Sequence, residues 1–140
     1  RLLRVRPGRD DVLALARAYA DALAEDAPEA IAFLRRVGVR VALVSGGLRQ
    51  AILPLARELG FAHDDVHAVD VVFDGGGGFV SWDAGSPLVT QRGKRTVVSR
   101  ALAAAGPDAR PALAVGDGST DVAMRGAAEG ACDALAAYVG

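Results

Sequence analysis

The chain has 140 residues, of which 51% are hydrophobic and 24% are charged, and its formal net charge is −1. This balance excludes an intrinsically disordered chain, a collagen-like repeat and a basic nucleic-acid-binding tail. Arg or Asp interrupts the apolar residues every few positions, so no segment is predicted to cross a membrane. A single cysteine excludes a disulfide framework and favours the reducing cytoplasm as the compartment.

The first part of the chain has the pattern of two helices, a strand and a third helix. Apolar residues recur at helical spacing in three segments, and a β-branched run separates the second segment from the third. Ser45-Gly46-Gly47 ends this run, and Pro54 falls within the last helix, where it removes one backbone hydrogen bond. In chain order we expect a helix over residues 10–25, a helix between Asp26 and Gly38, a strand over residues 39–44 and a helix over residues 48–59.

The second part continues the alternation of strands and helices. Four glycines after Asp74 separate two β-rich segments, which predicts a hairpin. In chain order we expect a strand over residues 66–73, its hairpin partner over 79–82, a helix over 93–105, a strand over 111–115, a helix over 121–128 and a last strand over 136–139. This alternation favours an α/β fold, with a parallel sheet covered by helices on both faces.

The first candidate site lies where the strand over residues 39–44 ends. Ligands of parallel α/β sheets bind at the carboxyl ends of the strands. Ser45-Gly46-Gly47, the glycine turn, leads directly into a helix, so its free backbone N–H groups suit an anion such as phosphate. The alternative is that Ser45 is only an N-cap and that the glycines only let the chain turn.

The second candidate site is the aspartate loop, Gly116-Asp117-Gly118-Ser119-Thr120-Asp121, which follows an apolar strand. Two carboxylates in a half-buried loop are costly unless a positive charge lies between them. Mg²⁺ fits, because it binds one or two carboxylates together with waters and a substrate phosphate. The spacing lacks the third glycine of a dinucleotide-binding fingerprint and the Gly and Glu of an EF-hand. The alternative is that the two carboxylates only cap the following helix.

Lys94 is the third candidate, because it stands in the first turn of its helix. A cation there opposes the helix dipole at a cost of about 0.3–1 kcal/mol. A functional role for Lys94, such as neutralising a phosphate as a point charge, would explain why a lysine stands there. A solvated lysine at a helix start is the alternative.

Two other features carry less weight. His63 and His67 have the spacing of a zinc-binding helix, but Gly60 has just ended a helix and a β-branched run begins, so we do not expect zinc there. Cys132 has no activating partner nearby in the sequence and is expected to be a small core residue.

Together these motifs resemble the haloacid dehalogenase superfamily of phosphotransferases, and most closely its phosphoserine phosphatase branch. The resemblance rests on residues 41–49 (Val-Ala-Leu-Val-Ser-Gly-Gly-Leu-Arg), on Gly93-Lys94 and on the aspartate loop, in the family's order and with its separations. It covers essentially the whole chain. It implies a Rossmann-like α/β core, with a parallel sheet flanked by helices, a β-hairpin insertion and the remnant of a helical cap.

The resemblance also implies residues that contact the substrate. Ser45 would hydrogen-bond the transferring phosphoryl group, and the backbone N–H groups of Gly46 and Gly47 would help position the substrate. Thr120 stands where relatives carry Asn or Thr near the substrate. Arg1 resembles the cap arginine that binds the substrate carboxylate.

Three further residues would manage charge. Lys94 would balance the charge on the phosphoryl oxygens and on the nucleophile. Asp117 would bind Mg²⁺ directly, and Asp121 would support either the metal or Lys94 from close by.

The resemblance is incomplete at one point. The family's nucleophile belongs to an Asp-x-Asp-x-Thr/Val stretch on the first strand, and no such stretch occurs in the 140 residues. That carboxylate is needed to form an aspartyl-phosphate, which water then hydrolyses. We therefore expect a fragment, with the end of a helical cap over residues 1–26 and a core that lacks its first strand over residues 27–140. Alone, it is expected to bind phosphate without turning it over.

The implied parent is a Mg²⁺-dependent enzyme that releases serine and phosphate from O-phosphoserine in serine biosynthesis. It would bind a small phosphomonoester, and it would bind neither nucleic acid nor a membrane. Two alternatives stay open. One is a relative that acts on another small phosphomonoester, and the other is a non-catalytic phosphate-binding module.

Overall fold

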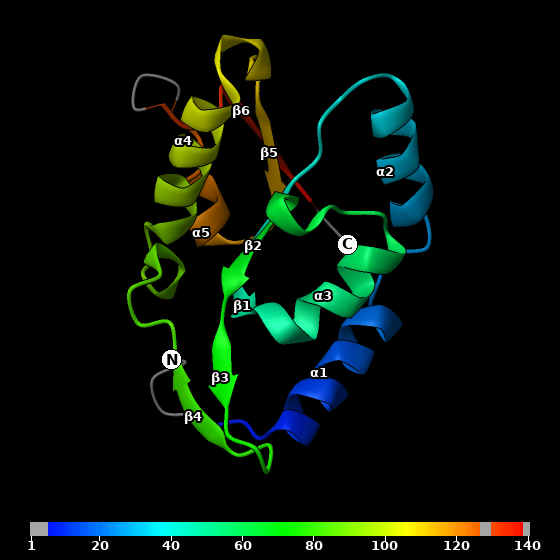
Figure 1. The fold of residues 1–140 in the computed structure, drawn as a ribbon. Coiled ribbons are helices and arrows are strands. Elements are labelled where there is room, and N and C mark those ends of the chain that lie inside the picture. The colour runs from blue at the N-terminus through cyan, green and yellow to red at the C-terminus, as the bar shows by residue number, and fades with distance from the viewer. Residues whose placement is uncertain (1–5, 127–129, 139–140) are drawn as a thin grey trace. The chain divides into compact units, whose positions relative to one another are not determined.

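The computed structural model describes residues 6–126 and 130–138, which form two compact units divided between Ala84 and Gly85 (Figure 1). Each unit is described by itself. In the described ranges the longest helices have 13 residues, and none is long and apolar enough to cross a membrane. The structure is of the mixed α/β class, with parallel strands and flanking helices, as the sequence predicts.

The first unit is built from helices and short strand pairs. Its strands β1 and β2 pair in parallel, and β3 and β4 form an antiparallel hairpin. A short 3₁₀ turn precedes β2. The elements are α1 (Arg9–Asp21), α2 (Ala27–Arg36), β1 (Leu43–Leu48), α3 (Arg49–Glu58), β2 (Val66–Val69), β3 (Val71–Phe73) and β4 (Phe79–Trp82).

The core of this unit forms where α1 packs against α3 (Figure 1). Val12 and Ala16 on α1 pack with Leu48, Ala51 and Val71. Ala51 is fully buried, because its small side chain lets the two helices approach closely. α3 continues past Pro54 without a break. A second cluster, around α3 and β2, completes the core of this unit.

The hairpin forms as predicted, and Asp74 holds its turn. The Asp74 carboxylate accepts hydrogen bonds from the backbone N–H groups of Gly76, at 2.9 Å, and Gly78, at 2.8 Å. Gly77 between them has a φ of +85°, which favours glycine. Trp82 packs edge-on against Phe79 within β4. The four-glycine segment is therefore a compact turn stabilised by one carboxylate.

The predicted strand over residues 39–44 is displaced towards the C-terminus. β1 begins at Leu43 and runs through the glycine turn to Leu48, although we expected the glycines to end it. Val44 pairs with His67, and the next pair is Leu48 with Val69. The two pairs are therefore further apart along β1 than along β2, and the ladder between them is irregular. Glycines are tolerated in a strand at such a bulge, and the expected break is therefore a distortion of the strand.

The second unit contains helix α4 (Gly93–Ala105), strand β5 (Leu113–Gly116), helix α5 (Ser119–Val122) and strand β6 (Ala134–Ala137). β5 and β6 pair in parallel, and α5 lies against both β5 and α4. α4 has the predicted bounds. Cys132 is buried in the core, as predicted, and burial raises the pKa of its thiol.

Several predicted bounds in the second unit are shifted. The strand predicted over residues 111–115 begins at Leu113, because Pro111 has no N–H to donate and the N–H of Ala112 donates to the Asp133 carboxylate. α5 begins at Ser119, two residues before the predicted start, and part of the predicted helix over 121–128 lies outside the described residues. The last strand also begins two residues early, at Ala134.

We predict that Gly93→Ala lowers the free energy of unfolding by about 1–3 kcal/mol, because a Cβ at Gly93 would overlap the carbonyl group of Pro87 and lie 2.7 Å from the Cα of Leu88. Urea unfolding followed by circular dichroism measures the change. Gly75→Ala is the matched control, since a Cβ there meets nothing within 4 Å. Equal unfolding midpoints for the two variants would contradict the close approach.

Candidate functional site

The glycine turn presents a serine hydroxyl next to the start of α3. The Ser45 Oγ accepts a hydrogen bond from the backbone N–H of Gly47 at 3.0 Å. The hydroxyl proton of Ser45 is therefore free to be donated to an anion. The N–H of Gly47 is already engaged inside the turn, whereas we expected it to contact the substrate. α3 begins two residues later, and the N-terminus of a helix favours negative charge.

Close packing explains the glycine at position 47. A Cβ there would lie 3.1 Å from the Tyr19 hydroxyl, 3.2 Å from the Ser45 Oγ and 3.4 Å from the Ile52 Cδ1. The space beside the turn is thus occupied by α1 and α3 side chains. Tyr19 was not a candidate in the sequence, because only the packing of α1 brings it to the turn.

In the second unit, Lys94 and Asp121 form an ion pair. The Lys94 Nζ donates to the Asp121 Oδ1 at 2.5 Å, and the backbone N–H of Gly118 donates to the Asp121 Oδ2 at 3.0 Å. The two side chains are only 19% and 8% exposed, respectively. Both carboxylate oxygens of Asp121 therefore have a donor, and hydrogen bonds of this charged kind are the stronger ones.

The surroundings keep Asp121 ionised. Burial alone would raise the pKa of this carboxyl, but the hydrogen bonds from Lys94 and Gly118 and the positive charge of Lys94 lower the pKa below its usual value. The stabilisation from the pair is therefore present above about pH 4, the ordinary Asp value, and is lost as the pH falls further. At neutral pH the pair holds an ammonium group in the first turn of α4.

Asp117 differs from Asp121 in its environment. It is exposed, directly after β5, and its carboxylate makes no hydrogen bond or ion pair with another residue of the described ranges. Gly116 before it is packed so closely that a Cβ would overlap the Asp121 carboxylate. The loop therefore presents one carboxylate outward and keeps the other for Lys94.

This arrangement bears on the expected Mg²⁺. Within the described residues no group of three or more His, Cys, Asp or Glu side chains could hold a metal ion. Of the two carboxylates in the aspartate loop, Asp117 is the one that other described residues leave free to bind a metal ion. A single carboxylate fits Mg²⁺, which completes its shell with waters and phosphate oxygens. The residues present thus fit a partial magnesium site.

The remaining candidates are placed as follows. Thr120 is half-buried in α5, and Arg1 lies outside the described residues. His63 lies in the 3₁₀ turn and His67 in β2, so they do not share the α-helix that the zinc motif requires. Burial, and then the charge of Arg49, lower the pKa of His67.

The structure brings some of these residues together. Lys94 meets Asp121, and Asp117 belongs to the same loop in the second unit, whereas the glycine turn belongs to the first unit. That the two sets approach one substrate stays a prediction. The N–H of Gly118 was not among the predicted site groups, although its three-residue spacing to Asp121 is that of a capping box.

Comparison with known proteins supports one family. A model described as haloacid dehalogenase-like hydrolase matches residues 1–125. The phosphoserine phosphatase SerB2 of Mycobacterium tuberculosis is 37% identical over 68% of this chain and 22% of its own length. The chloroplastic phosphoserine phosphatase of Arabidopsis thaliana is 31% identical over 80% of this chain and 37% of its own length. The phosphoserine phosphatase of Drosophila melanogaster is 29% identical over 87% of this chain and 45% of its own length.

Two solved structures share the fold. A phosphoserine phosphohydrolase-like protein of Francisella tularensis superposes with a TM-score of 0.71 at 22% identity, over 84% of this chain and 53% of that one. DsGPDH of Dunaliella salina superposes with a TM-score of 0.74 at 24% identity, over 97% of this chain and 22% of that one. The chain spans between 22% and 45% of the length of the three relatives above. With its aspartate loop and its Lys94–Asp121 pair, this chain belongs to the haloacid dehalogenase-like hydrolase family.

Proposed function

We propose that this chain supplies the phosphate- and metal-binding part of a Mg²⁺-dependent phosphomonoester hydrolase whose substrate is O-phosphoserine and whose products are serine and phosphate. The observation that carries the proposal is the largely buried Lys94–Asp121 pair in the same unit as the exposed carboxylate of Asp117. The relatives named phosphoserine phosphatase support the choice of substrate. A place in serine biosynthesis and a cytoplasmic location belong to the same proposal.

Four residues of this chain have a defined task in the proposal. The Ser45 hydroxyl donates to a phosphoryl oxygen, and the Lys94 ammonium neutralises negative charge on the others. Asp121 holds the Lys94 side chain in place. Asp117 would hold Mg²⁺, which supplies further charge neutralisation when bound. These groups stabilise charge and set geometry.

The covalent step needs a nucleophile that these residues do not provide. The 140 residues contain no Asp-x-Asp. We place residues 1–26 at the end of a cap and residues 27–140 in the core, and we assign the nucleophile to neither. For this chain alone, the missing carboxylate favours a second candidate function, a phosphate-binding module without turnover.

We expect the purified 140-residue chain to release phosphate from O-phosphoserine no faster than buffer, because its sequence lacks the Asp-x-Asp stretch that carries the family's nucleophile. A malachite-green phosphate assay with and without Mg²⁺ measures this. Mg²⁺-dependent release that disappears in Asp117→Asn would overturn the prediction.

We predict that loss of Lys94 weakens binding of inorganic phosphate at least about tenfold, equivalent to about 1.4 kcal/mol. Calorimetric titration of the chain with phosphate measures the affinity. Lys94→Ala would leave Asp121 buried and unpaired, so the double variant Lys94→Ala, Asp121→Asn keeps the fold testable.

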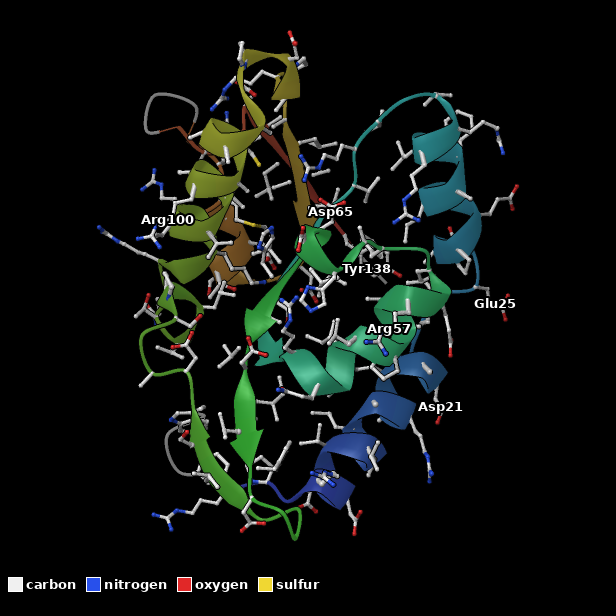
Figure 2. All side chains as sticks on the ribbon, viewed as in Figure 1. Asp21, Glu25, Arg57, Asp65, Arg100 and Tyr138 are labelled. Carbon is white, nitrogen blue, oxygen red and sulfur yellow. The ribbon has the colours of Figure 1, made fainter. Side chains whose placement is uncertain are left out.

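Arg100→Ala is the matched control for that titration. Arg100 lies on α4, the helix that carries Lys94, and its exposed side chain points away from the helix (Figure 2). We expect this variant to bind phosphate like the unmodified chain. Equal loss in the Lys94 and Arg100 variants would show that only total charge matters, and would remove Lys94 from the site.

We also predict that Asp117→Asn weakens Mn²⁺ binding, as a paramagnetic stand-in for Mg²⁺, at least about tenfold in the presence of phosphate. Water proton relaxation measures bound Mn²⁺. Asp108→Asn is the control, because Asp108 is another exposed carboxylate of the same unit. Unchanged binding in Asp117→Asn would exclude Asp117 as the ligand.

A further inference from the structure

The first two residues of α3, Arg49 and Gln50 (the anchor residues), come directly after β1, which contains the glycine turn. Neither has a task in the proposed function. The Arg49 side chain is only 13% exposed, although a cation in the first turn of a helix opposes the helix dipole. Hydrogen bonds to neighbouring segments offset this cost for Arg49, and Gln50 makes hydrogen bonds of the same kind.

Arg49 binds residues on both sides of β2. Its Nη1 donates to the carbonyl oxygen of Val66, and its Nη2 donates to the carbonyl oxygen of His63 at 2.9 Å. Nη2 also lies 3.2 Å from both ring nitrogens of His63, and Nε lies 3.9 Å from the Oδ1 of Asp70. Because His63 precedes β2 and Asp70 follows it, one guanidinium group ties the start of α3 to the whole length of that strand.

Gln50 binds the strand that follows. Its Nε2 donates to the carbonyl oxygen of Val71 at 2.7 Å, and its Oε1 accepts a hydrogen bond from the N–H of Val71 at 3.1 Å. The side-chain amide thus engages both backbone groups of one β3 residue, as the opposite residue does in a hydrogen-bonded antiparallel pair. The start of α3 is therefore tied to β3 as well as to β2.

These contacts are made where the pairing of β1 with β2 is interrupted. The glycine turn occupies three residues of β1 between two paired positions, whereas β2 has one residue, Ala68, between the same positions. Strand pairing therefore does not set the conformation of the turn by itself. The anchor residues hold the chain immediately after the interruption, and they thereby set where the turn ends and α3 begins.

We propose that Arg49 and Gln50 are positioning residues of the glycine turn: by tying the first turn of α3 to β2 and β3, they keep the Ser45 hydroxyl and the start of α3 in the arrangement that binds phosphate. The phosphate part of this statement rests on the proposed function. The Ser45 Oγ accepts a hydrogen bond from the N–H of Gly47 at 3.0 Å, so the Gly47 amide reports the conformation of the turn.

Substitutions that remove the anchoring groups test the proposal. Gln50→Leu removes the amide without changing the net charge, and Arg49→Leu removes the guanidinium group. We expect each to weaken binding of inorganic phosphate at least about fivefold in calorimetric titration. We also expect each to move the nitrogen–proton NMR signal of the Gly47 amide before phosphate is added. Arg49→Lys can still donate to the Val66 carbonyl oxygen and should recover most of the affinity.

Two controls on α3 separate positioning from net charge and from stability. Arg57→Leu removes an exposed arginine from the same helix (Figure 2). Ala56→Gly destabilises the helix at a fully buried position and leaves both anchor residues in place. Below their unfolding temperatures, we expect both controls to bind phosphate and to show the Gly47 signal as the unmodified chain does.

The outcomes separate this proposal from the proposed function. In a chain that binds phosphate, an unchanged affinity or an unchanged Gly47 signal in Gln50→Leu would overturn the positioning role, and so would an equal loss in either control. If Arg49→Leu does not fold, the same criteria apply to Gln50→Leu. A chain that binds no phosphate, but whose Gly47 signal moves in the anchor variants alone, supports the positioning role and overturns the proposed function of the turn.

Discussion

The ion pair between Lys94 and Asp121 is the constraint on which the second unit depends. Two charges removed from water must satisfy each other, and leaving one of them unpaired costs about 3–5 kcal/mol. Asp121 meets this requirement with Lys94 on one oxygen and the Gly118 N–H on the other. The start of α4 is thereby tied to α5. The pair also explains why an ammonium group is held where the helix dipole disfavours it.

Two glycines provide the space for that pair. Gly93 lets the first turn of α4 lie against the Pro87 carbonyl, and Gly116 lets the Asp121 carboxylate fold back against the end of β5. A methyl group at either position would overlap these neighbours. The outward position of Asp117 follows from the same geometry, because the loop turns Asp121 inward and leaves the adjacent carboxylate to solvent. In the proposed function, metal binding and lysine positioning are thus divided between two carboxylates.

In the first unit, the packing of α1 on α3 sets the surroundings of the glycine turn. Val12 and Ala16 belong to the buried core, and Leu15 and Tyr19 on the same helix pack against this core, with Tyr19 next to Gly47. The polar groups of the turn and the apolar groups of α1 therefore meet at one residue. In the proposed function, the Ser45 hydroxyl of the turn recognises phosphate, and the packing of α1 supports the turn.

The sequence by itself determined α4 and the hairpin, because their limits are set locally: α4 has its predicted bounds, and Asp74 with its glycines closes the predicted turn. It placed α1 and α5 only approximately, since α1 ends at Asp21 and α5 begins at Ser119. It also determined which residues belong to the family's motifs. Only the tertiary structure decided that β1 passes through the glycine turn, since that depends on pairing with β2. It alone decided that Asp121 pairs with Lys94, 27 residues away, because electrostatic attraction depends on distance in space and on burial, neither of which local sequence specifies.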